Sequence, residues 1–198
     1  MRFRTPTLVV PLLLAAVAFW FVAGPAYADK GDLLKLLKLA LPEAERFTQE
    51  GNVEALKTKS GQPVDGVKGV FYAYQGEKRI GVVVWTATPA YTPGEPVHVL
   101  TGFDAEGTIR NAIVFRHRET PGWVDPINNG SFQRQFAGVQ LGDKLSLVIN
   151  GGKVRRGDIV SIANSTISSK GVAVGVSQAR RLFGAVLADE LKGAKTSQ

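Results

Sequence analysis

The stretch Ser161-Ile-Ala-Asn-Ser-Thr-Ile-Ser-Ser-Lys170 joins a short β-type run, residues 158–162, to a strongly periodic helical pattern. Apolar side chains recur in that pattern at three- and four-residue steps, which is the spacing of one face of an α-helix. They are Val172, Val176, Ala179, Phe183, Val186 and Leu187. We therefore expect one long C-terminal helix that begins near Ser168 and frays after Leu191.

Small hydroxyl side chains crowd the entrance to this helix. The first backbone N–H groups of a helix have no partner within it, and that end of the helix dipole is positive. Such a place binds a phosphate, and Lys170 adds a positive charge to it. The alternative is that Ser165, Thr166 and Ser168 only cap the helix.

The chain before this helix predicts an α+β fold. We expect a twisted antiparallel sheet, an N-terminal helical segment and the long C-terminal helix, because several hairpins precede one long helix. The Val82–Trp85 run suits a strand that is buried on both faces. The expected strands cover residues 67–74, 79–88, 97–103 and 108–116, and residues 75–78 form a hairpin turn.

Other elements are predicted from local signals. Residues 30–50 suit a helix that Pro42 interrupts, with a second short helix starting there, and residues 58–66 suit a connector. In the 108–116 strand, alternation places Ile109, Ile113 and Phe115 on one face. Ser131 is expected to cap a short helix. Two further strands, 145–149 and 153–160, flank the tight-turn pair Asn150-Gly151.

The first 28 residues have the pattern of an export signal. Two arginines precede an apolar run from Leu8 to Val22, and Ala26-Tyr27-Ala28 fits the small-x-small cleavage rule. An uncleaved membrane anchor is the alternative. In both cases the remainder is expected in the periplasm or on the outer face of the inner membrane. The expected organisation is signal 1–28, helical segment and connector 29–64, and a main domain 65–198.

Composition excludes several classes of function. The chain has 24 Lys and Arg against 17 Asp and Glu, a formal charge of +7, without a clustered basic and aromatic face of the kind that binds nucleic acid. It has no cysteine, which rules out disulfides, thiolate metal sites and iron–sulfur clusters. With only two histidines, an organic cofactor is the expected carrier if the protein moves electrons.

Three segments, in this order, resemble the FMN-binding domain of the Rnf complex G subunit and of the C subunit of the sodium-pumping NADH:quinone reductase. They are His117-Arg-Glu-Thr-Pro-Gly122, Phe132-Gln-Arg-Gln-Phe-Ala-Gly138 and Ser165-Thr-Ile-Ser-Ser169. The resemblance covers roughly residues 94–183. Members of that family hold FMN through a phosphoester to a threonine, and the matching residue is Thr166.

The resemblance implies a set of cofactor-binding residues. Those at the helix entrance are Asn164, Ser165, Thr166, Ile167, Ser168 and Ser169, and those along the flavin ring are Glu119, Thr120 and Trp123. Asn164 replaces the family's glycine, and asparagine tolerates a positive φ. Two residues depart from the family's pattern, which has Ser or Thr where this chain has Ala163 and an acid where it has Val160. No catalytic or metal-binding residue is expected.

The resemblance implies an exported flavoprotein that relays electrons to a redox partner protein at the membrane, after a flavin transferase has attached FMN. Two alternatives remain open. One is a binding module of the same fold without flavin, suggested by the departures before Thr166. The other is a periplasmic flavin-dependent reductase that acts on a small acceptor.

Overall fold

A five-stranded antiparallel sheet forms the centre of the molecule, with strands in the order β1-β2-β3-β4-β5. The computed structural model describes residues 30–118, 127, 130–149, 151–152 and 155–193. The strands are β1 (Arg46–Gln49), β2 (Val67–Gln75), β3 (Lys78–Thr88), β4 (Val97–Asp104) and β5 (Ile109–Arg116). The four longer strands confirm the predicted hairpins, and each strand is a neighbour of the next because the connections are short.

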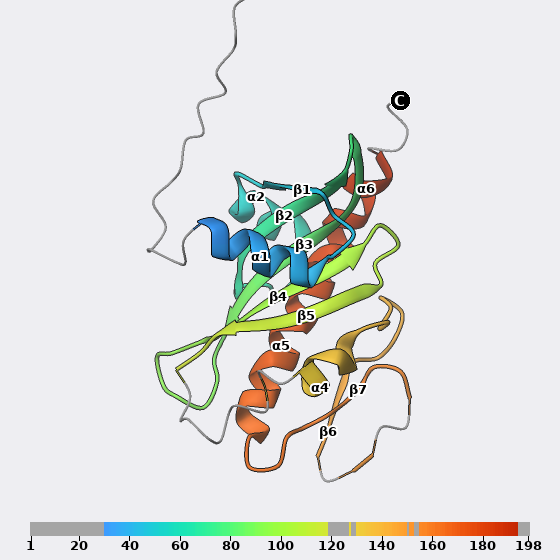
Figure 1. The fold of residues 1–198 in the computed structure, drawn as a ribbon. Helices are drawn as coiled ribbons and strands as arrows, with labels where there is room; N and C mark the ends of the chain where they lie inside the picture. The colour runs from blue at the N-terminus through green and yellow to red at the C-terminus, as the bar shows by residue number, and fades with distance from the viewer. Residues whose placement is uncertain (1–29, 119–126, 128–129, 150, 153–154, 194–198) are drawn as a thin grey trace, which may run out of the picture.

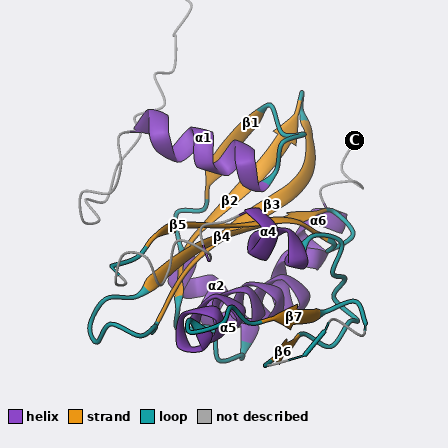
Figure 2. Ribbon diagram, turned by 60° about the horizontal axis from the view of Figure 1, so that its bottom comes forward, coloured by secondary structure: helices purple, strands orange, loops and turns teal. Residues whose placement is uncertain are grey.

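Helices cover both faces of the sheet. Figure 2 shows α1 (Lys30–Ala40) above the sheet, and α2 (Val53–Ser60) and α5 (Thr166–Leu182) below it. The predicted burial of β3 on both faces is confirmed, since Val82, Val83 and Val84 are all fully buried. Val82 and Val84 face α5, and Val83 faces α1. The α+β fold class is therefore confirmed.

The C-terminal helix is longer than the apolar periodicity of the sequence predicted. It begins at Thr166, two residues before the predicted start, and continues through a π-helical turn, η2 (Phe183–Leu187), into α6 (Ala188–Gly193) (Figure 1). The π turn keeps the apolar face directed at the core, where Phe183 stacks on Phe103 with ring centroids 4.9 Å apart. The described residues include no helix long and apolar enough to cross a membrane.

The α5 helix approaches the sheet closely because glycines face it. A Cβ on Gly175 would lie 2.7 Å from Oγ1 of Thr86, and one on Gly171 would lie 2.7 Å from the Pro89 carbonyl oxygen. Oγ1 of Thr88 donates a 2.7 Å hydrogen bond to the Gly171 carbonyl. The helix is therefore fixed against β3 near its first turns, where the predicted phosphate site lies.

Three local predictions were wrong, two of them before β2 and the third in β5. The chain turns after α1 and forms the edge strand β1 in place of a second helix at Pro42. The predicted connector overlaps α2, which is capped by the Asn52 side chain accepting from the Ala55 N–H at 2.9 Å. In β5, a bulge opposite Gly102 and Phe103 turns Ile109 to the α5 face, away from Ile113 and Phe115.

The segment between the sheet and α5 also departs from the local signals. Ser131 lies within the short helix α4 (Gly130–Gln133), which continues as the 3-10 turn η1 (Arg134–Phe136). Strands β6 (Ser146–Val148) and β7 (Asp158–Val160) pair in parallel, so the hairpin expected around Asn150-Gly151 was wrong. Ile159 of β7 is buried in the main core, and a local turn signal does not contain information on such distant contacts.

Candidate functional site

The predicted phosphate site lies where β7 leads into α5. Asn164 has a φ of +63°, the only positive φ at a non-glycine residue among the described residues. The N–H of Ser165 donates to the Ile162 carbonyl at 3.0 Å, which closes a turn before the helix. Asparagine adopts this left-handed conformation more readily than most residues, so the replacement of the family's glycine is compatible with the turn.

The helix entrance has donors that point out of the helix. Ser165 occupies the N-cap position, and its carbonyl accepts from the Ser169 N–H at 2.9 Å, the first hydrogen bond of the helical series. The N–H groups of residues 166–168 precede that bond and have no acceptor within the helix. Ser165 makes no side-chain cap hydrogen bond, so the capping alternative is not supported at this residue.

The hydroxyl groups at the entrance differ in accessibility. Ser165, Ser168 and Ser169 are buried, with 5%, 2% and 0% of their surface exposed. Thr166 is only partly buried, and Asn164 is exposed. The threonine hydroxyl is therefore the hydroxyl group best placed among these to meet a ligand from outside.

The remaining predicted residues divide into two groups. Ile167 is 53% exposed, and Lys170, one turn after Thr166, is exposed as well. Residues at i and i+4 lie on the same side of a helix, so Lys170 adds charge on the side where Thr166 lies. Glu119, Thr120 and Trp123 fall outside the described residues.

Arg118, the last described residue before Glu119, is held by the β3–β4 loop. It pairs with Glu95 at 3.1 Å, and its carbonyl accepts from Oγ1 of Thr92 at 3.0 Å. Both partners belong to the β3–β4 loop, whose Pro89 lies against Gly171 in α5. A pocket lies in this loop, lined by Lys68, Ala87, Pro89, Ala90, Thr92, Pro93, Gly94, Glu95 and Pro96.

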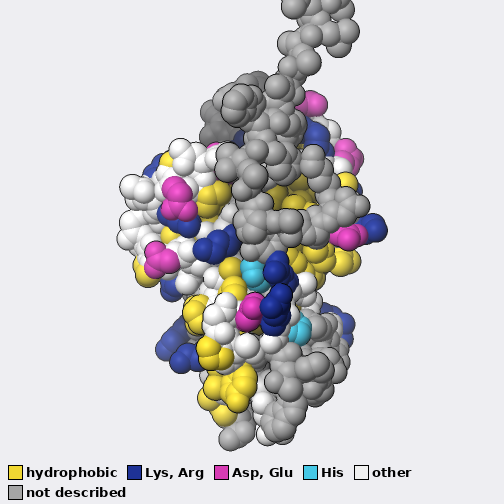
Figure 3. Space-filling view, turned by 90° about the vertical axis from the view of Figure 1, so that its left-hand side faces the viewer, with side chains coloured by type: hydrophobic (Ala, Val, Ile, Leu, Met, Phe, Trp, Pro, Cys, Tyr) yellow, Lys and Arg dark blue, Asp and Glu magenta, His cyan; other side chains and the backbone are white. Residues whose placement is uncertain are grey.

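A buried histidine lies on the α1 face of the sheet. The indole Nε1 of Trp85 donates a 3.1 Å hydrogen bond to Nδ1 of His98, so the neutral ring carries its proton on Nε2. Burial, followed by the positive charges of Arg116 and Lys68, lowers the pKa of His98 from 6.5 to about 4, against a smaller opposing effect of Glu95. Figure 3 shows the side of the molecule that lies on the left in Figure 1. On this side, histidine side chains lie next to basic and apolar ones.

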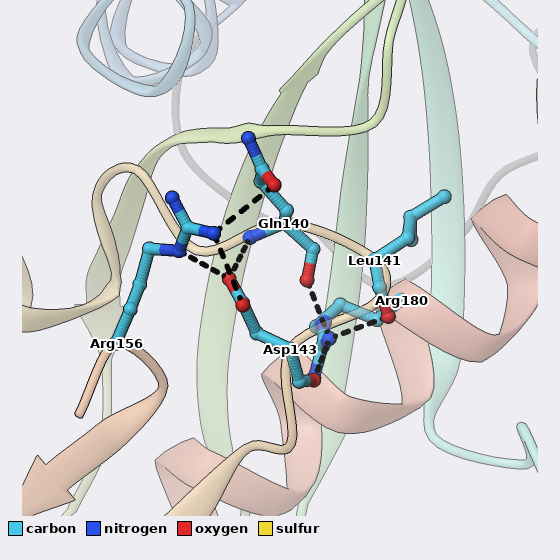
Figure 4. Close-up of polar contacts among 5 residues, drawn as sticks. All are labelled: Gln140, Leu141, Asp143, Arg156 and Arg180. Carbon is cyan, nitrogen blue, oxygen red and sulfur yellow. Dashed lines mark hydrogen bonds and ion pairs between the residues drawn. The ribbon is translucent and has the colours of Figure 1, made fainter.

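A polar network holds the loop before β6 against α5 (Figure 4). The Arg180 guanidinium donates to the carbonyls of Gln140, Leu141 and Asp143 at 2.7, 2.9 and 2.6 Å. Arg156 pairs with the Asp143 carboxylate at 2.7 Å. The backbone N–H of Gln140, together with Arg156, lowers the pKa of Asp143. Because β6 pairs with β7, this network supports the strand that leads to Thr166.

A glutamine missed by the sequence analysis contacts the same strand. Gln135 accepts from the Val160 N–H at 2.8 Å and donates to the Val160 carbonyl at 3.2 Å. Residues 132–138 were part of the family resemblance, but the pattern assigned no role to this side chain. The two residues are 25 positions apart, so the contact depends on the tertiary fold.

Comparison with known proteins shows which family the chain resembles. Residues 94–181 match the sequence model of the FMN-binding domain family. This part of the chain resembles an FMN-binding domain. The matched part runs from the β3–β4 loop through β4 to β7 and most of α5, so it includes Asn164, Thr166 and Lys170. The strands β1 to β3 lie outside the match but complete the same sheet.

Two curated relatives are G subunits of ion-translocating complexes. The chain is 29% identical over 145 residues to the G subunit of the Na⁺-translocating ferredoxin:NAD⁺ oxidoreductase complex of Acetobacterium woodii, covering 72% of this chain and 70% of that protein. It is 25% identical over 170 residues to the G subunit of the proton-translocating complex of Clostridium ljungdahlii, covering 85% of this chain and 80% of that protein.

A solved structure shares the fold. NqrC from Shewanella oneidensis superposes with a TM-score of 0.60 at 15% identity, over 82% of this chain and 97% of that one. The described residues contain no group of three or more His, Asp or Glu that could hold a metal ion. The donors at the α5 entrance and the exposed Lys170 instead suit the phosphate of FMN, since N–H groups at a helix start favour an anion.

Proposed function

We propose that this protein is an exported flavoprotein that holds FMN through a phosphoester to Oγ1 of Thr166 and relays electrons to a redox partner at the membrane. Bound FMN supplies reversible electron transfer, and the protein supplies its position and surroundings. The observation that carries the proposal is the partly exposed Thr166 at the first position of α5, within the part of the chain that matches the FMN-binding family.

The residues at the α5 entrance have separate tasks in this proposal. Oγ1 of Thr166 would form the ester bond to phosphorus, losing its proton as the bond between phosphorus and the leaving group of the flavin donor breaks and that group departs with the bonding electrons. The N–H groups of the first helical turn would hold the remaining phosphate oxygens. Lys170 offsets the negative charge that the ester retains. The three serines at the entrance, at positions 165, 168 and 169, are buried. The Ser169 hydroxyl accepts from the Ile162 N–H at 3.1 Å.

A covalent bond suits a protein outside the cytoplasm, because flavin that dissociates there is diluted and lost. Export is supported by the sequence of residues 1–28, with its basic start, apolar run and small residues at 26 and 28. Attachment requires a flavin transferase that supplies the FMN group. We therefore propose that the domain lies in the periplasm or at the outer face of the inner membrane.

A relay is favoured over a stand-alone enzyme. Both curated relatives are named as subunits of ferredoxin:NAD⁺ oxidoreductase complexes, so the partner expected here is another redox protein. A periplasmic reductase would need a substrate site with its own acid or base. The described residues near the α5 entrance offer Lys170, serines and Thr166 in place of a carboxylate pair.

In-gel flavin fluorescence after denaturing electrophoresis tests the proposal. We expect the wild-type protein, co-produced with a flavin transferase, to fluoresce and Thr166→Ala to lose the signal. Thr166→Ser is the matched control, since it keeps a hydroxyl at the same place. A yellow protein whose flavin is released by acid would show non-covalent FMN, and a colourless wild-type protein would refute the proposal in favour of a flavin-free module.

A further inference from the structure

We infer that Gln135 is a positioning residue for the FMN site. This inference rests on the function proposed above. Its side-chain amide binds both backbone polar groups of Val160, six residues before Thr166. In this position the amide acts as a substitute for a neighbouring strand along the free edge of β7. It thereby fixes the path of the chain into the α5 entrance.

Strand β7 is held from two sides. Strand β6 pairs with one side, with the Ser161 N–H donating to the Val148 carbonyl at 2.9 Å. Gln135 occupies the other side, where Val160 presents its own N–H and carbonyl. A three-residue strand with one partner is short of hydrogen bonds, so the two bonds from Gln135 are a large part of what holds it.

The hydrogen bonds that fix the chain continue from β7 towards the turn at Asn164. Three successive N–H groups have acceptors from three different elements: Val160 from η1, Ser161 from β6, and Ile162 from the Ser169 hydroxyl in α5. The chain therefore reaches the left-handed Asn164 along a fixed path. Without Gln135, the first of these contacts is lost and the Val160 groups are left to find other partners.

Gln135 is itself anchored by its neighbours. Phe132 and Phe136 are 3% and 0% exposed, and their rings meet edge to face at 5.7 Å in the main core. This aromatic pair fixes the backbone of η1, so the Gln135 amide is directed at β7 before any flavin is present. A site that is ordered in advance binds its ligand without the cost of ordering it.

Flavin stoichiometry in Gln135 variants tests the inference. We expect Gln135→Leu, co-produced with a flavin transferase, to hold at least about tenfold less FMN per protein than wild type. The matched control is Gln178→Leu, because Gln178 also binds backbone, accepting from the Gly66 N–H at 2.7 Å, but lies further along α5. The control should lose thermal stability and keep its FMN.

The variant Gln135→Glu separates positioning from loss of folding. A neutral carboxyl group can both accept from the Val160 N–H and donate to its carbonyl, whereas a carboxylate only accepts. The carboxylate keeps the bond from the Val160 N–H but repels the Val160 carbonyl, which loosens the strand. Hydrogen exchange of the next two amides, Ser161 and Ile162, corrected for the intrinsic rate, should therefore be slow at acidic pH and at least about tenfold faster at neutral pH. In wild type the corrected exchange should not change in this way.

The outcomes are distinguishable. Wild-type protein without FMN would refute the proposed function. Wild type with FMN and Gln135→Leu with the same FMN content would overturn this inference alone. Equal loss of FMN in Gln135→Leu and Gln178→Leu would also overturn it, because the effect would then follow stability and not the position of β7.

Discussion

Asn164 fixes the backbone geometry of the α5 entrance. Its φ of +63° costs a residue with a β-branched side chain about 1–2 kcal/mol, whereas glycine adopts it freely. Asn164 is exposed, so a substitution there removes little packing. A substitution at this position therefore changes stability almost only through the backbone conformation.

We expect Asn164→Val to lower the free energy of unfolding by about 1–2 kcal/mol and Asn164→Gly to leave it within about 0.5 kcal/mol of wild type. Urea denaturation monitored by tryptophan fluorescence measures both. Flavin content should fall in the valine variant only. A valine variant as stable as wild type would mean that this residue does not adopt a positive φ in solution.

His98 makes stability depend on pH. Its pKa is about 4 in the folded protein against 6.5 in the unfolded chain, so as pH falls the unfolded chain takes up the proton first. The stabilising contribution of the neutral ring is complete above pH 6.5 and is lost between pH 6.5 and 4. The loss is on the order of 3 kcal/mol.

Urea unfolding of wild type and His98→Asn from about pH 7 to pH 4 gives the free energy of unfolding of each protein as a function of pH. Asparagine keeps an acceptor for the Trp85 N–H without titrating, so its curve should be flatter than that of wild type. Parallel curves for wild type and His98→Asn would contradict the assignment.

At the scale of elements, the contact of α5 with β3 positions the proposed flavin site. Gly175 faces Thr86, which is fully buried. We expect Gly175→Val to lower the free energy of unfolding by about 1–3 kcal/mol, because the added side chain pushes the helix from the sheet. Gly184→Ala is the control, since a Cβ there meets nothing within 4 Å and should stabilise the helix by about 0.5–1 kcal/mol.

Thermal unfolding and flavin content of both glycine variants measure this effect. The displaced helix in Gly175→Val should also reduce FMN loading, because the first turn of α5 moves with it. If Gly175→Val were as stable as Gly184→Ala, the close approach of helix and sheet would be refuted.

Elements with a strong local period were predictable, and those decided by distant contacts were not. The run Val82–Val84 has no polar alternation, which indicated a strand buried on both faces. Strand β1 has no such signal, because an edge strand is half exposed and is specified by pairing with β2. The parallel pairing of β6 with β7 likewise lacks a local signal, because the turn pair between them indicated a hairpin.

In the candidate site, too, residues with a local signal were predictable and those that depend on distant contacts were not. Thr166 was found from local chemistry, since hydroxyl residues at a helix start are visible in the sequence. The role of Gln135 was not, because its partner Val160 is 25 residues away. The bulge in β5, which turns Ile109 to the other face, also lacks a local signal strong enough to locate it.

At the scale of the whole molecule, the two faces of the sheet carry separate cores. One contains α1 with Leu37, Leu41 and Leu100, and the other contains α5 with Phe103 and Phe183. The entrance to α5 belongs to the second face (Figure 2). Disturbing α1 should therefore leave the flavin site largely intact.

Gly102 tests this separation, because a Cβ there would collide with the Ala40 carbonyl at the end of α1. We expect Gly102→Ala to expose α1 to proteolysis and to lower the free energy of unfolding by about 1–3 kcal/mol, while the FMN content stays at the wild-type level. Gly142→Ala, where a Cβ has open space, is the control. A parallel loss of FMN would show that the two faces are coupled.

The most direct measurement of the central claim is the mass of the tryptic peptide Gly157–Lys170, which contains Thr166 and no other threonine. From protein co-produced with a flavin transferase, we predict a mass increased by one FMN less one water, with fragmentation placing the addition on Thr166. An unmodified peptide, or an addition placed on one of its serines, would contradict the account.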